Sequence, residues 1–78
     1  MNLNIITPDK SIFKDEASLV QLPGVDGSFE ILENHAPLIS ALKKGKLKVI
    51  KTDKTEVFFE INGGIVEVLN NKVLILAK

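Results

Sequence analysis

Apolar residues recur at every second position in short runs along this chain, and this period constrains the fold more than any other feature. A period of two is typical of β-strands, because successive side chains point to opposite faces of a sheet. In Glu56–Ile61 the alternation places two glutamates and Phe58 on one face and three apolar side chains on the other. No long segment competes with the 3.6-residue period of a helix. The sequence therefore predicts an all-β fold.

Turn-forming residues separate the apolar runs at intervals of about 8 to 12 residues, as in all-β domains. Asp26-Gly27 supplies positive φ, Asn70-Asn71 stands where a two-residue hairpin turn would, and Gly63-Gly64 is expected to separate two strands. Nine strands are predicted: Leu3–Thr7, Ile12–Lys14, Ser18–Leu22, Ser28–Leu32, Leu38–Leu42, Lys46–Lys51, Glu56–Ile61, Ile65–Leu69 and Lys72–Leu76.

The length of the chain, 78 residues, predicts one domain over residues 1–78. A chain this short buries only about 60% of the surface that its unfolded form exposes, so most apolar residues must serve the core. Nine short strands in a single flat sheet would leave the apolar face of that sheet in water. We therefore predict a small β-sandwich of two packed, mainly antiparallel sheets, with about nine or ten short strands.

The charges of the chain argue against several classes of partner. Ten basic and ten acidic residues cancel, and no window gathers five like charges, so we expect no nucleic-acid partner. The lysines of Lys43–Lys51 alternate with apolar residues, as on the solvent face of a strand. The absence of cysteine excludes disulfides and thiolate metal sites. No segment approaches the ~20 apolar residues that span a bilayer, so we expect no direct membrane insertion.

Catalytic chemistry is difficult to assemble from this composition. An enzyme needs a nucleophile with its base, a carboxylate pair or a metal cluster within hydrogen-bond reach. His35 is the only histidine, and we interpret it as a loop residue with one structural hydrogen bond or as a contact with a partner protein. Asp26, Glu30 and Glu33 could form a carboxylate pair in principle, but strand alternation separates Glu30 from Glu33. No catalytic residue, metal site or cofactor is predicted.

Lys54 offers an alternative with defined chemistry. Lipoyl and biotinyl carrier domains are β-sandwiches of similar length that present a modified lysine at a hairpin tip, and Asp53-Lys54 lies between two predicted strands. On this alternative the chain is a swinging-arm carrier. Asp-Lys is, however, common composition for a hairpin tip, and the other glycine positions of the carrier families are not evident.

Four blocks of the sequence, in their order and spacing, resemble one family. The blocks are LNIITP at Leu3–Pro8, LVQLPGVDGSFEIL at Leu19–Leu32, NHAPLISALKKGKLKV at Asn34–Val49, and INGGIVEVLNNKVLILA at Ile61–Ala77. On these blocks, which cover nearly the whole chain, the sequence resembles the epsilon subunit of bacterial F-type ATP synthases, the counterpart of the mitochondrial delta subunit. The N-terminal domain of that family is a ten-stranded β-sandwich, which agrees with the fold predicted from periodicity.

The resemblance implies a non-catalytic rotor subunit in the central stalk of a proton-translocating ATP synthase. Such subunits bind the gamma subunit and help fasten it to the ring of membrane c subunits, at the cytoplasmic face of the bacterial inner membrane. By resemblance, Thr7 and His35 are expected near the gamma subunit. From strand alternation, we also hypothesise that outward apolar residues such as Phe58 face that subunit. The expected contact with the c-ring comprises Val25, Asp26, Gly27, Ser28 and Glu30.

The sequence departs from the family pattern at several positions. Glu30 stands where the family typically has glycine, and it adds charge and bulk near the expected ring contact. Glu33-Asn34 replaces a typical Pro-Gly, and Asn34 is predicted to take over the left-handed backbone of that glycine. Family members commonly continue into a C-terminal helical hairpin, whereas this chain stops at Lys78. We expect no ATP binding without that hairpin.

Overall fold

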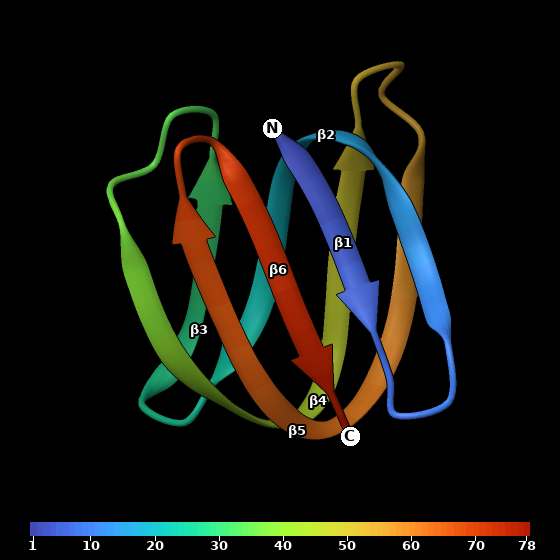
Figure 1. Cartoon of the computed structure of the whole chain (residues 1–78), viewed down its shortest axis with the longest axis vertical. Coiled ribbons are helices and arrows are strands. Elements are labelled where there is room, and N and C mark those ends of the chain that lie inside the picture. The colour runs from blue at the N-terminus through green and yellow to red at the C-terminus, as the bar shows by residue number, and fades with distance from the viewer.

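The computed structural model describes all 78 residues and contains strands but no helix (Figure 1). Its Cα atoms extend over 27 × 23 × 18 Å. Since there is no helix, none is long and apolar enough to cross a membrane. The six strands are β1 (Asn2–Ile6), β2 (Ser11–Gly24), β3 (Gly27–Leu32), β4 (Leu38–Lys51), β5 (Glu56–Leu69) and β6 (Lys72–Ala77).

The strands pair in the order β1-β6-β5-β4-β2-β3, and β1 also pairs with β2. Every pair is antiparallel except β1 with β6. These pairings form two layers, and the layer that faces the viewer in Figure 1 is called the front sheet here. The front sheet consists of β1, β6, residues 11–16 of β2, residues 38–42 of β4 and residues 65–69 of β5. The rear sheet consists of β3, residues 17–24 of β2, residues 46–51 of β4 and residues 56–61 of β5.

The predicted all-β sandwich is confirmed, but the predicted strand count was wrong. Three pairs of predicted strands are continuous, so that nine segments form six strands. Each of β2, β4 and β5 is 14 residues long and passes from one sheet to the other. The expected break at Gly63-Gly64 is instead a bend, where positive φ angles of 118° and 150° turn the chain. Gly64 still pairs with Leu42 on one side and Ala77 on the other, so β5 does not end there.

The core lies between the two sheets and is entirely apolar. It comprises 16 buried hydrophobic residues, and no polar or charged side chain is buried. Phe13 and Phe59 meet edge to face at its margin, with ring centroids 5.6 Å apart, an arrangement that aromatic pairs favour. The largest fully buried side chains are Leu3, Ile5, Val20, Leu22, Ile31, Leu47, Val49, Val66 and Ile75. The alternation predicted for Glu56–Ile61 is confirmed, since Ile61 is buried and Phe58 exposed.

Asparagines form the turns at the end of the molecule where the β3–β4 loop lies. Asn70 and Asn71 have φ angles of 51° and 60° and close the predicted β5–β6 hairpin. Asn34 has a φ of 59°, which confirms the predicted left-handed backbone. The Asn34 N–H donates to Asn71 Oδ1 at 2.8 Å, and Asn71 Nδ2 donates to Glu33 Oε2 at 3.0 Å. The β3–β4 loop is therefore held against the β5–β6 turn.

Candidate partner-binding surfaces

The residues expected at the c-ring all lie on the β2–β3 hairpin. Gly24 pairs with Gly27, which leaves Val25 and Asp26 at the tip. A Cβ at Gly24 would lie 2.6 Å from the Gly27 carbonyl oxygen, so glycine is required for this tight turn. Val25 is 53% exposed, and its N–H donates to the Ala41 carbonyl oxygen at 3.2 Å. The hairpin thus presents an exposed apolar tip that is anchored to β4.

The other ring-contact candidates are exposed but not equivalent. Asp26, Gly27 and Ser28 are exposed at the turn. Glu30 is exposed farther along β3, where it pairs with Gln21 on the outer surface of the rear sheet. The charge and bulk of Glu30 therefore lie beside the turn rather than on it.

Thr7 belongs to the β1–β2 connection and His35 to the β3–β4 connection. These two connections lie at opposite ends of the long axis of the molecule (Figure 1). Thr7 opens the β1–β2 turn, where its Oγ1 donates to the Lys10 carbonyl oxygen at 3.0 Å. His35 lies in the β3–β4 loop with its Nδ1 2.8 Å from the Ala36 carbonyl oxygen. Because a carbonyl oxygen only accepts, Nδ1 carries the hydrogen. The structure therefore does not bring the two residues together.

The acidic residues near His35 in sequence do not converge on a catalytic site. Asp26 lies on the β2–β3 turn, whereas Glu33 follows β3 at the other end of that strand. The ammonium group of Met1 and the Asn71 side chain hydrogen-bond to Glu33 and lower the pKa of its carboxyl group. No group of three histidine, cysteine, aspartate or glutamate residues is placed to hold a metal ion.

Lys54 occupies the β4–β5 hairpin tip, as the carrier alternative requires. Its φ is 72°, and its N–H donates to the Lys51 carbonyl oxygen at 2.9 Å. Asp53 Oδ1 accepts a hydrogen bond of 2.9 Å from the Thr55 N–H. These are local turn interactions, which account for the composition of the tip without a modified lysine.

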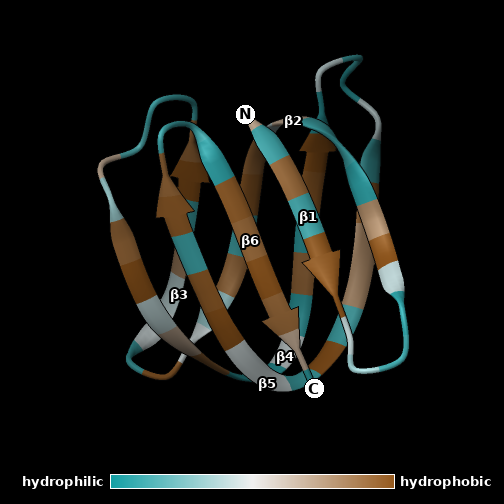
Figure 2. Ribbon diagram, viewed as in Figure 1, coloured by the Kyte–Doolittle hydropathy of each residue, from teal (hydrophilic) through white to brown (hydrophobic).

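A large apolar surface on the outside of the front sheet was missed by the sequence prediction. We call it the front apolar face, and it consists of Ile6, Ile39, Ile65, Leu69, Leu74 and Leu76. Strand register places Ile6, Leu76 and Ile65 in one row across β1, β6 and β5. Ile39 on β4 is 72% exposed, and Ile65, Leu69 and Leu76 are about half exposed. Ile6 and Leu74 are partly buried. Figure 2 shows that β6 is hydrophobic along nearly its whole length.

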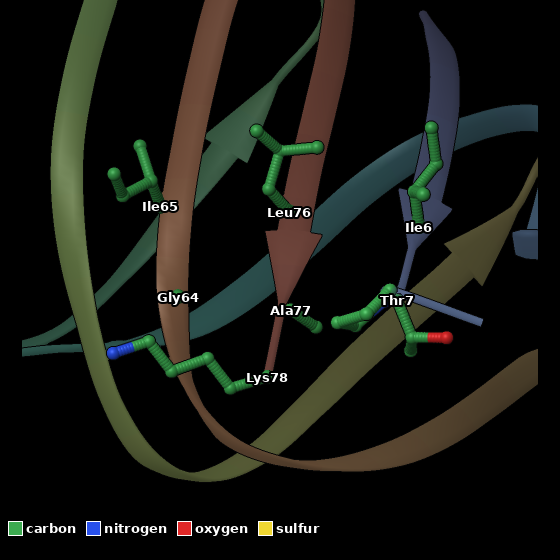
Figure 3. A pocket seen from close by; sticks show the side chains of 8 residues that line it. Ile6, Thr7, Gly64, Ile65, Leu76, Ala77 and Lys78 are labelled. Atoms are coloured by element: carbon green, nitrogen blue, oxygen red, sulfur yellow. The ribbon is translucent and has the colours of Figure 1, made fainter. Parts of the chain in front are cut away.

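Two shallow hollows shape this face. The first, of about 380 Å³, is drawn in Figure 3 and is lined by Ile6, Thr7, Pro8, Gly64, Ile65, Leu76, Ala77 and Lys78. The second, of about 490 Å³, is lined by Pro37, Leu38, Ile39, Glu67, Val68 and Leu69. The front apolar face is therefore contoured rather than flat, which favours specific packing against a partner.

The sequence carried a signal for this face. The runs IVEVL and VLILA keep apolar residues at positions that alternation assigns to the solvent side. A strand that is apolar on both faces needs cover on both. Because the core covers only one of these faces, the apolar side chains on the other face indicate an interaction surface.

Comparison with known proteins identifies the family. The whole chain, residues 1–78, matches the family described as ATP synthase, Delta/Epsilon chain, beta-sandwich domain. It is 46% identical over 76 residues to the ATP synthase epsilon chain of Chlorobium limicola, spanning 97% of this chain and 86% of that one. It is 44% identical over 77 residues to the corresponding chain of Desulforamulus reducens, of which it covers 56%.

Solved structures share the fold. A chain of the Euglena gracilis mitochondrial ATP synthase, solved as OSCP/F1/c-ring, has a TM-score of 0.90 at 23% identity, over 96% of this chain and 48% of that one. A chain of the Tetrahymena thermophila enzyme, solved as central stalk/c-ring, has a TM-score of 0.83 at 23% identity, over 99% and 62%. The family match and the shared fold agree, and the chain belongs to the β-sandwich domain family of ATP synthase delta/epsilon chains.

Proposed function

We propose that this chain is a non-catalytic rotor subunit in the central stalk of a rotary, proton-translocating ATP synthase. It binds a gamma-type stalk subunit and links that subunit to the ring of c subunits. The observation that carries the proposal is the front apolar face, a contiguous exposed surface on a chain of this family. Monomeric proteins rarely expose such surfaces without a binding role.

The gamma-type subunit binds at the front apolar face. Thr7 lines the first hollow, and Pro37, two residues after His35, lines the second. The two residues expected near gamma thus flank the two ends of one surface, which supports a single large interface. Phe58 is less suited to this role, because it lies on the rear sheet with Lys46 Nζ 5.7 Å from its ring centroid.

The c-ring binds at the β2–β3 hairpin. Val25 supplies an exposed apolar tip, and Asp26, Ser28 and Glu30 surround it with polar groups. The hairpin is anchored to the rest of the sandwich by the pairing of β2 with β4 and by the Val25 hydrogen bond to β4. This contact is smaller and more polar than the gamma interface.

The same proposal assigns no catalytic residue, cofactor or ATP site to residues 1–78. The subunit works at the cytoplasmic face of the membrane as a peripheral member of the complex. The carrier alternative is not retained, because the family match spans the whole chain and names ATP synthase rather than a lipoyl or biotinyl carrier.

Binding to a gamma-type stalk subunit tests the proposal. Native mass spectrometry of the two proteins at micromolar concentration is expected to show a one-to-one complex. The double variant Ile65→Thr/Leu76→Thr removes two exposed apolar side chains while keeping residues that strands tolerate, and it is expected to weaken the complex at least tenfold. Phe58→Thr on the rear sheet is the matched control and should bind within about twofold of the natural chain. No complex with the natural chain would refute the proposal.

A further inference from the structure

Glu67 lies in the middle of the front apolar face. Ile39 and Leu74 are its direct partners on the neighbouring strands, and Ile65 and Leu69 flank it on β5. The Glu67 side chain is exposed, and none of the four ion pairs in the molecule includes it. One acidic group is thus framed by four apolar side chains.

The other charged groups of the front sheet lie outside this frame. Lys72 lies at the start of β6, two residues before Leu74, a direct partner of Glu67. Lys72 itself pairs with Leu69 and Asn2. Lys14 and Glu16 lie beyond β1, on the first half of β2. None of these side chains is paired with Glu67 in the free molecule.

A partner that covers the front apolar face removes water from the Glu67 carboxylate. Burial of an unpaired carboxylate is strongly unfavourable, whereas a carboxylate that meets a cation in the interface is tolerated and adds specificity. A wholly apolar partner surface is therefore a poor match for this face. The partner has to bring a positive charge to the position of Glu67.

The two hollows set the spacing of the partner's apolar contacts. Ile65 borders the first hollow and Leu69 the second. These residues are four apart on β5, which corresponds to about 13 Å along an extended strand. Glu67 lies midway between these two residues on β5 and also lines the second hollow, so a cation that pairs with it lies at the edge of that hollow.

We infer that the gamma-type subunit presents two apolar side chains about 13 Å apart, with an arginine or lysine between them that pairs with Glu67. The apolar side chains enter the two hollows and supply most of the affinity. The charge pair fixes the register, since a shift along β5 would bury Glu67 against apolar surface. Arginine suits the position better than lysine, because its guanidinium binds a carboxylate through two hydrogen bonds.

The inference rests on the proposed function, and its test uses the complex with the gamma-type subunit. Glu67→Gln removes the charge and is expected to weaken binding about tenfold, and Glu67→Lys about a hundredfold. Glu60 provides the matched control, because it is an exposed glutamate on the same strand whose side chain lies on the rear sheet. Glu60→Gln should leave the affinity unchanged within about twofold.

Charge reversal on the partner identifies the cation. Each arginine and lysine of the gamma-type subunit is changed to glutamate and tested against Glu67→Lys, and one of these variants should restore binding. Equal affinities for the natural chain, Glu67→Gln and Glu67→Lys would overturn the inference while leaving the proposed function intact. Self-association that depends on Glu67, measured by analytical ultracentrifugation without gamma binding, would overturn both.

Discussion

At the scale of single residues, two glycines with positive φ perform different tasks. Gly64 has a φ of 150°, and a Cβ placed there would lie 2.2 Å from the Leu76 carbonyl oxygen. Gly27 has a φ of 128°, but a Cβ there would meet nothing within 4 Å. At position 64 a side chain would therefore clash between β5 and β6, whereas at position 27 glycine is favoured only by the backbone angle.

Alanine substitutions separate these two requirements. Gly27→Ala is expected to cost about 1 to 3 kcal/mol of unfolding free energy, because of its unfavourable backbone angle. Gly64→Ala should cost a further ~1 to 3 kcal/mol, since β6 must move away from β5. Urea denaturation of both variants measures the difference, and equal losses would contradict the steric role of Gly64.

At the scale of elements, two exposed aspartates stabilise the region where β4 ends and the β4–β5 hairpin begins. The pKa of Asp15 is lowered by the Glu16 N–H, which donates to it at 2.7 Å, and by Lys51 Nζ at 3.1 Å on β4. The pKa of Asp53 is lowered by the Thr55 N–H in the β4–β5 hairpin. Both interactions are stronger with the ionised carboxylate than with the protonated one.

Acid should therefore weaken these elements. Because both pKa values are lower in the folded chain, the unfolded chain binds more protons as the pH falls, and folding stability rises with pH in that range. The contribution is complete above the unfolded aspartate pKa of about 3.9 and is lost as the pH falls through the folded values. The double variant Asp15→Asn/Asp53→Asn should show a flatter dependence of unfolding free energy on pH below about 4. An unchanged slope in chemical denaturation would contradict this assignment.

At the scale of the whole molecule, the two proposed contacts lie on separate surfaces. The front apolar face extends over β1, β6, the second half of β5 and the start of β4, whereas the β2–β3 hairpin projects from the lower end of the sandwich in Figure 1. The rigid apolar core between the sheets joins these surfaces. Such an arrangement allows one domain to hold two rotor components at once.

Separate surfaces should give independent effects on binding. Val25→Asp is expected to weaken binding to a purified c-ring at least tenfold and to leave gamma binding within about twofold. Ile65→Thr/Leu76→Thr should do the reverse, and the combined variant should show both losses, additive within about 0.5 kcal/mol. Biolayer interferometry with each partner measures these affinities. A single variant that weakened both contacts would show that the surfaces are coupled.

The fold class, most turns and the inward-facing residues could be predicted from sequence because they depend on local rules. Alternation distinguished Ile61 from Phe58, and asparagine at a left-handed position identified the backbone at Asn34. The residues proposed for the ring contact lie on one hairpin because they are neighbours in the chain.

The continuity of β5 and the front apolar face were decided by the tertiary structure. Gly63-Gly64 is locally a break signal, and it becomes a bend only because β4 and β6 pair with β5 on both sides. Ile6, Leu76 and Ile65 are far apart in sequence and form one row only through strand register. Local sequence thus determined which residues form strands and turns, and the packing of distant strands determined where their surplus apolar side chains meet.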